Sequence, residues 1–164
     1  MEDVIQIKKD NILKVKIIDE FGEDTGNYLE FDLEDIELPL RINEANKEHE
    51  KNERYFKTQK LIINKRQDKK GKYLLSKNQE DLIKLYNEYY EREIKVLDSF
   101  LGDGGTKKLL NGRKPYATMF DDIEEYLKPI LPKLEKTKEQ IGEKIKKKYG
   151  EIDGDVLKWN PRKL

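Results

Sequence analysis

The alternation of apolar and polar residues near the start of the chain predicts a β-hairpin over residues 12–33. Apolar side chains take every second position in two runs, which is the period of a strand with one buried face. The two glycines of segment 20–27 separate the runs, as a turn requires. The alternating positions are Leu13, Val15 and Ile17, followed by Leu29, Phe31 and Leu33. A short apolar run at 4–7 predicts an earlier strand, paired across a turn at Asp10 and Asn11.

After the hairpin the apolar residues change to a helical period, which predicts two long helices over residues 41–66 and 77–101. Pro39 marks the start of the first helix, and Ser76 followed by Gln79 forms a capping box that starts the second. The expected inner faces are Ile42, Ala45, His49, Phe56 and Ile63, and then Ile83, Tyr86, Tyr90, Ile94, Leu97 and Leu101. Because the helices have similar lengths and one connection, they should form an antiparallel helical hairpin.

Three shorter helices are expected next, over residues 106–111, 116–128 and 133–149. Thr106 should cap the first of them, and Pro115 should lie in the first turn of the second. Pro129 and Pro132 should end or kink the chain between the second and the third. Gly150 is a suitable C-terminal cap for the last helix.

These elements predict a fold that is mainly α with an N-terminal β-hairpin, an α+β arrangement built around a long antiparallel helical hairpin. An isolated two-stranded hairpin is only marginally stable, so it must pack on the helices. The length of 164 residues suits one domain, which we assign to residues 1–150. Residues 151–164 have no apolar period and are expected to form a flexible tail.

The composition predicts a lean core, or apolar surface that a partner completes. Charged residues make up 41% of the chain, against about 25% in a typical soluble domain. The 34 basic and 34 acidic residues balance, so the basic excess of a nucleic-acid-binding protein is missing. The sequence has no cysteine, no long apolar run and no signal segment at its start. We therefore expect a cytoplasmic protein without disulfides and without a membrane span.

The stretch SFLGDGGTKKLLNGRKPYATMFDDI, residues 99–123, combines glycines with lysines and raises the question of a phosphate site. A phosphate-binding loop needs a strand, then the order G-x-x-x-x-G-K-[ST], and then a helix. Here a helix precedes the glycines, and Gly105 is followed by Thr106 and then Lys107. The glycines are therefore expected to end and separate helices, with no nucleotide or other cofactor bound.

No residue is predicted to be catalytic or to bind a metal. His49 is the only histidine, and without cysteine the chain lacks the donor set of a zinc site. The acidic segments 19–26 and 151–156 lack the ligand order of a calcium-binding EF-hand loop. Tyrosines at 86–90 and lysines at 133–150 are compatible with nucleic-acid contact. Their spacing instead favours core or interface positions for the tyrosines and a solvated helical face for the lysines.

Three sequence blocks carry a resemblance to a known family. They are FLGDGGTKKLLNGRKPYATMFDDIEE at 100–125, LEFDLEDIELPLRI at 29–42, and KKGKYLLSKNQEDLIKLYNEYYEREIKVLDSF at 69–100. In the first block a helix ends in a turn of phenylalanine, glycine, acidic residue and glycine, and a short basic and apolar helix follows. These blocks resemble the tail assembly chaperones of tailed phages and prophages. The resemblance covers about residues 13–133, and Leu101 and the doubled glycine at 104–105 depart from the family pattern.

The resemblance implies a protein that is not an enzyme. Members of this family coat the long, helical tape measure protein and keep it soluble until tail tube subunits polymerise around it, and they self-associate. Two alternatives stay open: a structural tail or head–tail connector subunit retained in the virion, and a small nucleic-acid-binding regulator.

The apolar residues around the glycine turns are the predicted partner-binding face. Two helices change direction there, so a groove forms easily, and the alternative is that the same residues fill the core. The predicted contact residues are Phe100, Leu101, Leu109, Leu110 and Phe120. The expected partners are the tape measure protein, the tail tube subunit and a second copy of this chain.

Overall fold

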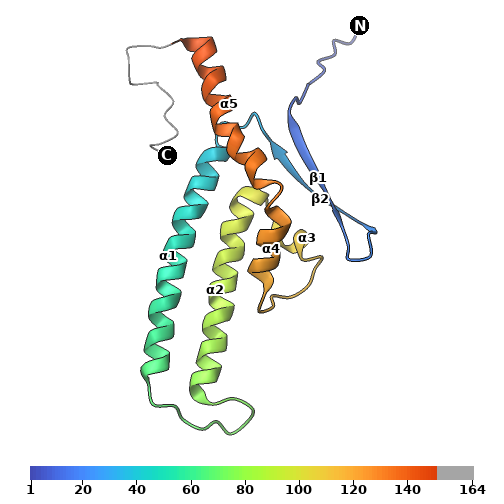
Figure 1. Cartoon of the computed structure of the whole chain (residues 1–164). Helices are drawn as coiled ribbons and strands as arrows, with labels where there is room; N and C mark the ends of the chain where they lie inside the picture. Colours follow the sequence, from blue (N-terminus) through green and yellow to red (C-terminus); the bar gives the residue numbers. More distant parts are fainter. Residues whose placement is uncertain (151–164) are drawn as a thin grey trace.

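The computed structural model describes residues 1–150, and its fold is mainly α with an N-terminal β-hairpin (Figure 1), as the sequence predicts. A two-stranded antiparallel sheet is followed by a long helical hairpin and shorter C-terminal helices. The predicted tail at 151–164 lies outside the described residues. The elements are β1 (Ile12–Ile18), β2 (Asp24–Asp32), α1 (Leu38–Lys65), α2 (Lys77–Leu101), α3 (Gly105–Leu109), α4 (Met119–Leu127) and α5 (Leu131–Tyr149).

The β-hairpin is antiparallel and has the predicted single buried face. Val15 lies opposite Leu29, and Leu13 lies opposite Phe31. Leu29 and Phe31 are buried, while Glu30 between them is exposed. The turn is closed by Asp19, whose carboxylate accepts the backbone N–H groups of residues 21 and 23. The alternation in the sequence thus translates directly into an inner and an outer face of the sheet.

The strand predicted at 4–7 is wrong. Residues 1–10 form no helix or strand, and β2 is the only strand within residues 1–150 that pairs with β1. Asn11 adopts a left-handed conformation with φ of 62°, and its carbonyl accepts the N–H of Leu33. The chain therefore leaves the sheet at this residue, and the apolar run before it has no strand to pair with.

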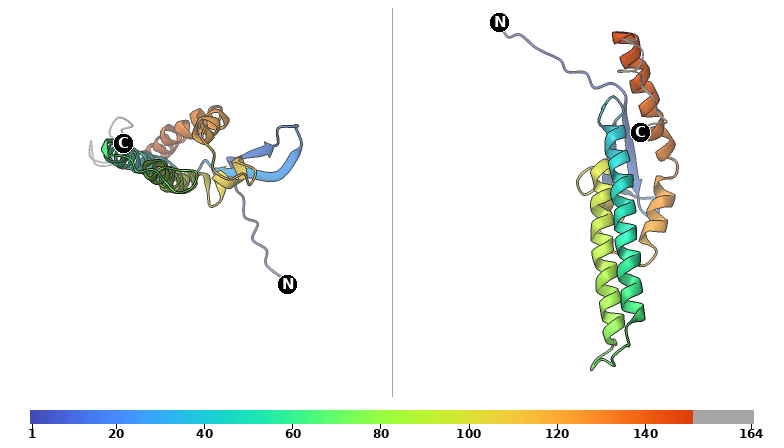
Figure 2. Two further views of the ribbon diagram at one scale, coloured as in Figure 1. Left: turned by 90° about the horizontal axis from the view of Figure 1, so that it is seen from below. Right: turned by 90° about the vertical axis from the view of Figure 1, so that its left-hand side faces the viewer.

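The two long helices form the predicted antiparallel hairpin, and they lie side by side in both views of Figure 2. α1 begins three residues earlier than predicted, because Pro39 lies in its first turn and not before it. α2 begins as predicted with a complete capping box between Ser76 and Gln79. At the far end, the Asn78 side-chain amide donates to the Ile63 carbonyl at 3.1 Å and joins the helices.

The inner face of α2 differs from the predicted stripe. Leu85 and Glu93 are buried, whereas Ile83 is 48% exposed and Tyr86 is 36% exposed. In α1, Asn52 is buried in the seam, where the sequence indicated only a polar gap. The reason is that α2 packs against α1 on one side and toward α4 on the other, so its broad apolar surface is divided between two neighbours.

The starts of α3 and α4 also differ from prediction. The N-cap of α3 is Gly104, and Thr106 is a buried residue of the helix whose hydroxyl donates to Asp98 at 2.7 Å. α4 begins three residues later than predicted, so Pro115 lies outside it. The Tyr116 hydroxyl donates to Asp122 at 2.6 Å, which ties the preceding turn to the helix. This bond to a carboxylate is the main cause that raises the pKa of Tyr116 to about 12.

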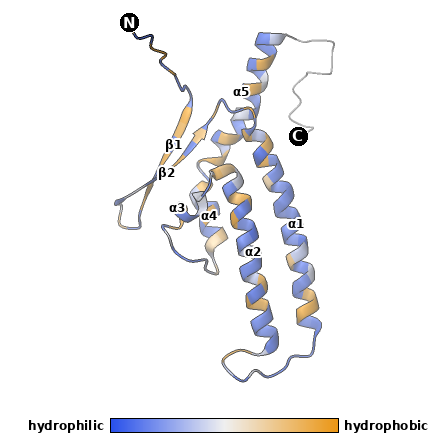
Figure 3. Cartoon of the chain, turned by 180° about the vertical axis from the view of Figure 1, so that it is seen from behind, coloured by the Kyte–Doolittle hydropathy of each residue, from blue (hydrophilic) through white to orange (hydrophobic). Residues whose placement is uncertain are grey.

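The core lies where the β-hairpin, α3, α4 and the start of α5 meet the adjoining ends of α1 and α2. Its buried residues are Leu29, Phe31, Leu38, Leu101, Leu110, Met119, Ile123, Leu127, Ile130 and Leu134. The long helices extend well beyond it (Figure 1), and apolar residues recur at their far end and in the connecting loop (Figure 3). Within residues 1–150, no helix combines the length and apolar character that crossing a membrane demands.

Candidate partner-binding groove

A groove of about 410 Å³ opens between α1, α2, α4 and α5, and we call it the four-helix groove. α4 and α5 both lie on one side of the helical hairpin, as Figure 2 shows, and they form the outer wall of the groove. The apolar walls include Ile42, Leu97, Phe100, Phe120, Leu127 and Leu131. The polar residues that line it are Asn46, His49, Tyr89, Glu93, Glu124 and Glu135. No lysine or arginine of the described chain is among its lining residues.

Aromatic side chains hold α4 against the helical hairpin. The rings of Tyr90 and Phe120 meet edge to face, with centroids 4.9 Å apart and planes at 88°. Tyr89 contacts the same phenylalanine at 5.9 Å and stacks on Phe56 of α1 at 4.6 Å. The Tyr90 hydroxyl donates to the Ala117 carbonyl at 3.2 Å, just before α4 begins. The tyrosines of α2 thus serve the packing role that their helical spacing favours.

α5 is anchored at both of its ends by different interactions. Leu134 and Ile141 are buried, and Thr137 is buried between them. Lys144 forms an ion pair with Glu34, which follows β2, so the helix is joined to the end of the β-hairpin. Hydrogen bonding to this lysine lowers the pKa of the Glu34 carboxyl. The outer wall of the groove is therefore tied to two separate parts of the fold.

Glu93 is the unusual residue of the groove, because it is only 5% exposed and carries a carboxyl group. Its Oε2 atom lies 2.8 Å from Nδ1 of His49, a hydrogen-bond distance. Its Oε1 atom is buried and has no hydrogen-bond partner among the described residues, 1–150. Nearby, burial raises the pKa of Tyr89 to about 12, and the charges of Glu93 and Glu53 add to this effect. The tyrosine hydroxyl is therefore neutral near pH 7.

The five predicted contact residues do not form a single face. Phe100 and Phe120 line the four-helix groove, whereas Leu109 and Leu110 line a second hollow of about 620 Å³ beside β1. Leu101 is 4% exposed and Leu110 is 8% exposed, and both belong to the core. Leu101 lines neither hollow, and Leu110 is a core residue at the wall of the second one.

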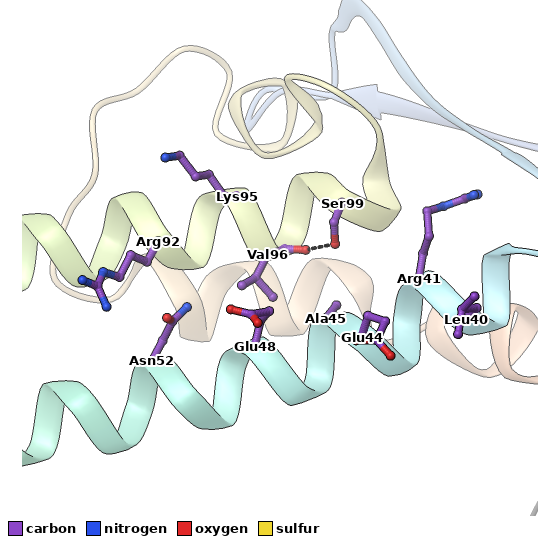
Figure 4. Close-up of a pocket in the computed structure, with 10 residues that line it drawn as sticks. All are labelled: Leu40, Arg41, Glu44, Ala45, Glu48, Asn52, Arg92, Lys95, Val96 and Ser99. Atoms are coloured by element: carbon purple, nitrogen blue, oxygen red, sulfur yellow. Dashed lines mark hydrogen bonds between the residues drawn. The ribbon is translucent and has the colours of Figure 1, made fainter.

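A third hollow lies on the other side of the helical hairpin and has a different character. Figure 4 shows Val96 pointing from α2 toward α1, where Ala45 and Asn52 face it. Its lining also includes exposed or half-exposed side chains with charges of both signs, namely Arg41, Glu44, Glu48, Arg92 and Lys95. Ala45 and Val96 also line the four-helix groove, so the small alanine leaves the helix pair hollowed on both sides. The mixed charges give this third surface no preference for a ligand of one sign.

The glycine-rich stretch forms turns around α3. Gly102 ends α2 with φ of 95°, and Gly104 precedes α3 with φ of 72°. At the start of α3 the Asp98 carboxylate accepts hydrogen bonds from both the backbone N–H and the hydroxyl of Thr106. A carboxylate already occupies the position that a bound phosphate would need at this helix start. Within residues 1–150, no group of three histidine, aspartate or glutamate side chains is arranged to hold a metal ion.

Glu93 was missed by the sequence reasoning, although a signal for it exists. It continues the series Leu82, Tyr86, Tyr89, Glu93, Val96 and Phe100, which follows the alternating three- and four-residue spacing of a buried helical seam. A charged residue at such a position is either exposed, because the helix presents that side to solvent, or buried, because a neighbouring group pairs with its charge. The choice between these two outcomes depends on the neighbouring helices.

No family model matches the chain, and neither a curated protein nor a solved structure matches it. A function for this protein therefore has to be inferred from its own groove and from its sequence blocks.

Proposed function

We propose that this protein is a phage tail assembly chaperone, which binds the tape measure protein in the host cytoplasm and keeps it soluble during tail assembly. The observation that carries the proposal is the four-helix groove, an apolar channel between helices with Phe100 and Phe120 in its walls. Such grooves bind amphipathic helices by receiving their apolar side chains. A helical tape measure segment offers that kind of surface. The sequence blocks that resemble tail assembly chaperones supply part of the groove lining, including Phe100 and Phe120.

Self-association is the second part of the proposal. Large apolar side chains are exposed at the far end of the helical hairpin, at Leu61, Ile62, Tyr73, Leu74 and Ile83. Exposed apolar surface of this kind is a common mark of a protein–protein interface. It supports assembly of several copies along one elongated partner, and the tail tube subunit is a further candidate for contact. The chain acts in this proposal by binding alone and has no enzymatic role.

The direct test is co-expression with the tape measure candidate, the long helical coding region nearest to this gene. Expressed alone, that partner should be found mainly in the pellet, and with this chain it should move to the soluble fraction. Purified virions should lack the chaperone. Its presence in particles would favour a structural tail or connector subunit, and a steep salt dependence of binding to nucleic acid would favour a regulator. If the chain is monomeric and leaves the partner insoluble, the proposed function is wrong.

Reversing the charge at the rim of the groove should weaken this protection. Glu124 and Glu135 are exposed residues that line the groove, so Glu124→Lys with Glu135→Lys should not disturb the fold. The two lysines turn an acidic rim into a basic one, and most of the tape measure protein should return to the pellet. The matched control is Glu125→Lys with Glu139→Lys, which changes the net charge equally at exposed positions outside the groove.

Both double variants should first be compared with the wild type by circular dichroism and thermal melting. Equal protection by the groove variant and by the control variant would show that the partner binds elsewhere on the molecule.

A further inference from the structure

We infer that the four-helix groove receives a lysine or arginine side chain from an otherwise apolar helical segment, and that Glu93 is the counter-ion for it. The identity of the natural segment, a part of the tape measure protein, rests on the proposed function. The chemistry of the groove itself does not. The preference for a basic side chain follows from the unpaired oxygen of one buried carboxylate and from the acidic residues that line the groove.

Glu93 is incompletely paired in the chain as described. Its side chain is more than nine-tenths buried, and within the described part of the chain one of its two oxygens has no hydrogen-bond partner. A buried polar atom without a partner costs about 1–3 kcal/mol, and more when the group is charged. The other oxygen contacts His49, whose second ring nitrogen lies 3.5 Å from Glu53. The imidazole is therefore shared between two carboxylates, and Glu93 keeps an acceptor free.

The charges that line the groove favour a cation. Glu124 and Glu135 add two further carboxylates, and none of the lining residues within positions 1–150 is lysine or arginine. This is notable in a chain with 34 basic residues among 164. Three carboxylates would repel an anion, so a phosphate or an acidic peptide does not fit this site.

The remaining walls of the groove determine which cation fits. They are aliphatic and aromatic, with Leu97 and Phe100 from α2 facing Phe120 from α4. Lysine and arginine have long apolar stems that pack along such walls while the charged end reaches a carboxylate. A small hydrated cation would leave these walls without contacts. The groove therefore fits an amphipathic basic side chain, carried on a helix whose neighbouring residues are apolar.

The test uses two synthetic helical peptides of about 20 residues, a length that supports helix formation in isolation. Both carry leucine and isoleucine along one face, and they differ only at the centre of that face, where one has lysine and the other norleucine. Binding to the full-length chain is measured by calorimetry. The lysine peptide should bind at least about tenfold more tightly, as expected for a hydrogen bond to a buried charged group.

The decisive variant is Glu93→Gln, which keeps the size of the side chain and removes its charge. It should bind both peptides equally, whereas Glu91→Gln, at an exposed position on the same helix outside the groove, should keep the preference for lysine. Circular dichroism and thermal melting should verify that both variants are folded. If Glu93→Gln does not fold, Glu93→Met offers an uncharged side chain of similar length for the same measurement.

The inference is wrong if wild type binds the norleucine peptide as tightly, if it binds neither peptide, or if the preference for lysine survives at Glu93→Gln. It is also wrong if sedimentation shows that Glu93→Gln dissociates an oligomer, because the occupant would then be a second copy of this chain. These results differ from a failure of the proposed function. If only the proposed function is wrong, the two peptides would still bind as expected, but the tape measure protein would stay in the pellet.

Discussion

An alanine in place of Met119 should lower the free energy of unfolding by about 2–5 kcal/mol, which is the largest stability change expected in this protein. Met119 is 0% exposed and is the first residue of α4. It belongs to the core cluster that joins β2, the end of α2 and the start of α5. Removing its side chain leaves a cavity at the point where α4 docks, and the surrounding elements are too well fixed to close it fully.

Urea unfolding monitored by circular dichroism measures the change in the free energy of unfolding. The slope of that free energy against urea concentration should be the same for the variant and the wild type. The control is Leu74→Ala, which removes a similar apolar side chain that is 92% exposed in the loop between the long helices. It should change the free energy by less than about 0.5 kcal/mol. Equal effects of the two substitutions would show that α4 does not dock on the core through Met119.

Replacing Gly102 by alanine should cost about 1–3 kcal/mol. Its φ of 95° and ψ of 159° lie in a region of backbone conformation that is essentially restricted to glycine. Gly105 is required for a different reason, because a Cβ atom there would lie 2.7 Å from Cβ of Leu101. Gly105→Ala should therefore push α3 away from α2, at a cost of about 1–3 kcal/mol.

The matched control for both glycines is Lys107→Ala, an exposed position in the same short helix, with an expected effect below about 0.5 kcal/mol. Thermal melting of the three variants compares their stabilities, and both glycine variants should melt at a lower temperature than Lys107→Ala. If Gly105→Ala melts with the control, α3 does not pack closely on α2. If Gly102→Ala melts with the control, the turn after α2 relaxes into a conformation that alanine tolerates.

Local interactions explain why much of this fold could be predicted from the sequence. The β-hairpin follows from apolar residues at every second position, since successive side chains in a strand point to opposite faces. The start of α2 follows from Ser76 and Gln79, because a capping box is formed by atoms only three residues apart. The end of α2 at Gly102 follows in the same way from a residue that tolerates an unusual backbone conformation. None of these features depends on distant parts of the chain.

The tertiary structure decided which side of each helix meets which neighbour. The apolar surface of α2 is broad enough to serve two partners. Tyr90 contacts Phe120 of α4, whereas Tyr89 contacts both Phe120 and Phe56 of α1. The split of the predicted contact residues between two hollows has the same origin, because α3 reverses the chain between Phe100 and Leu109.

The burial of Glu93 is the clearest case of a feature that only the tertiary structure decided. In the sequence it is one of many glutamates at helical spacing, and most of these are exposed. It becomes buried because α1 brings His49 against it and the groove is closed on its outer side by α4 and α5. The environment of a charged residue is set by surfaces far away along the chain, so a periodic pattern in one helix predicts the stripe but not the partner of each residue in it.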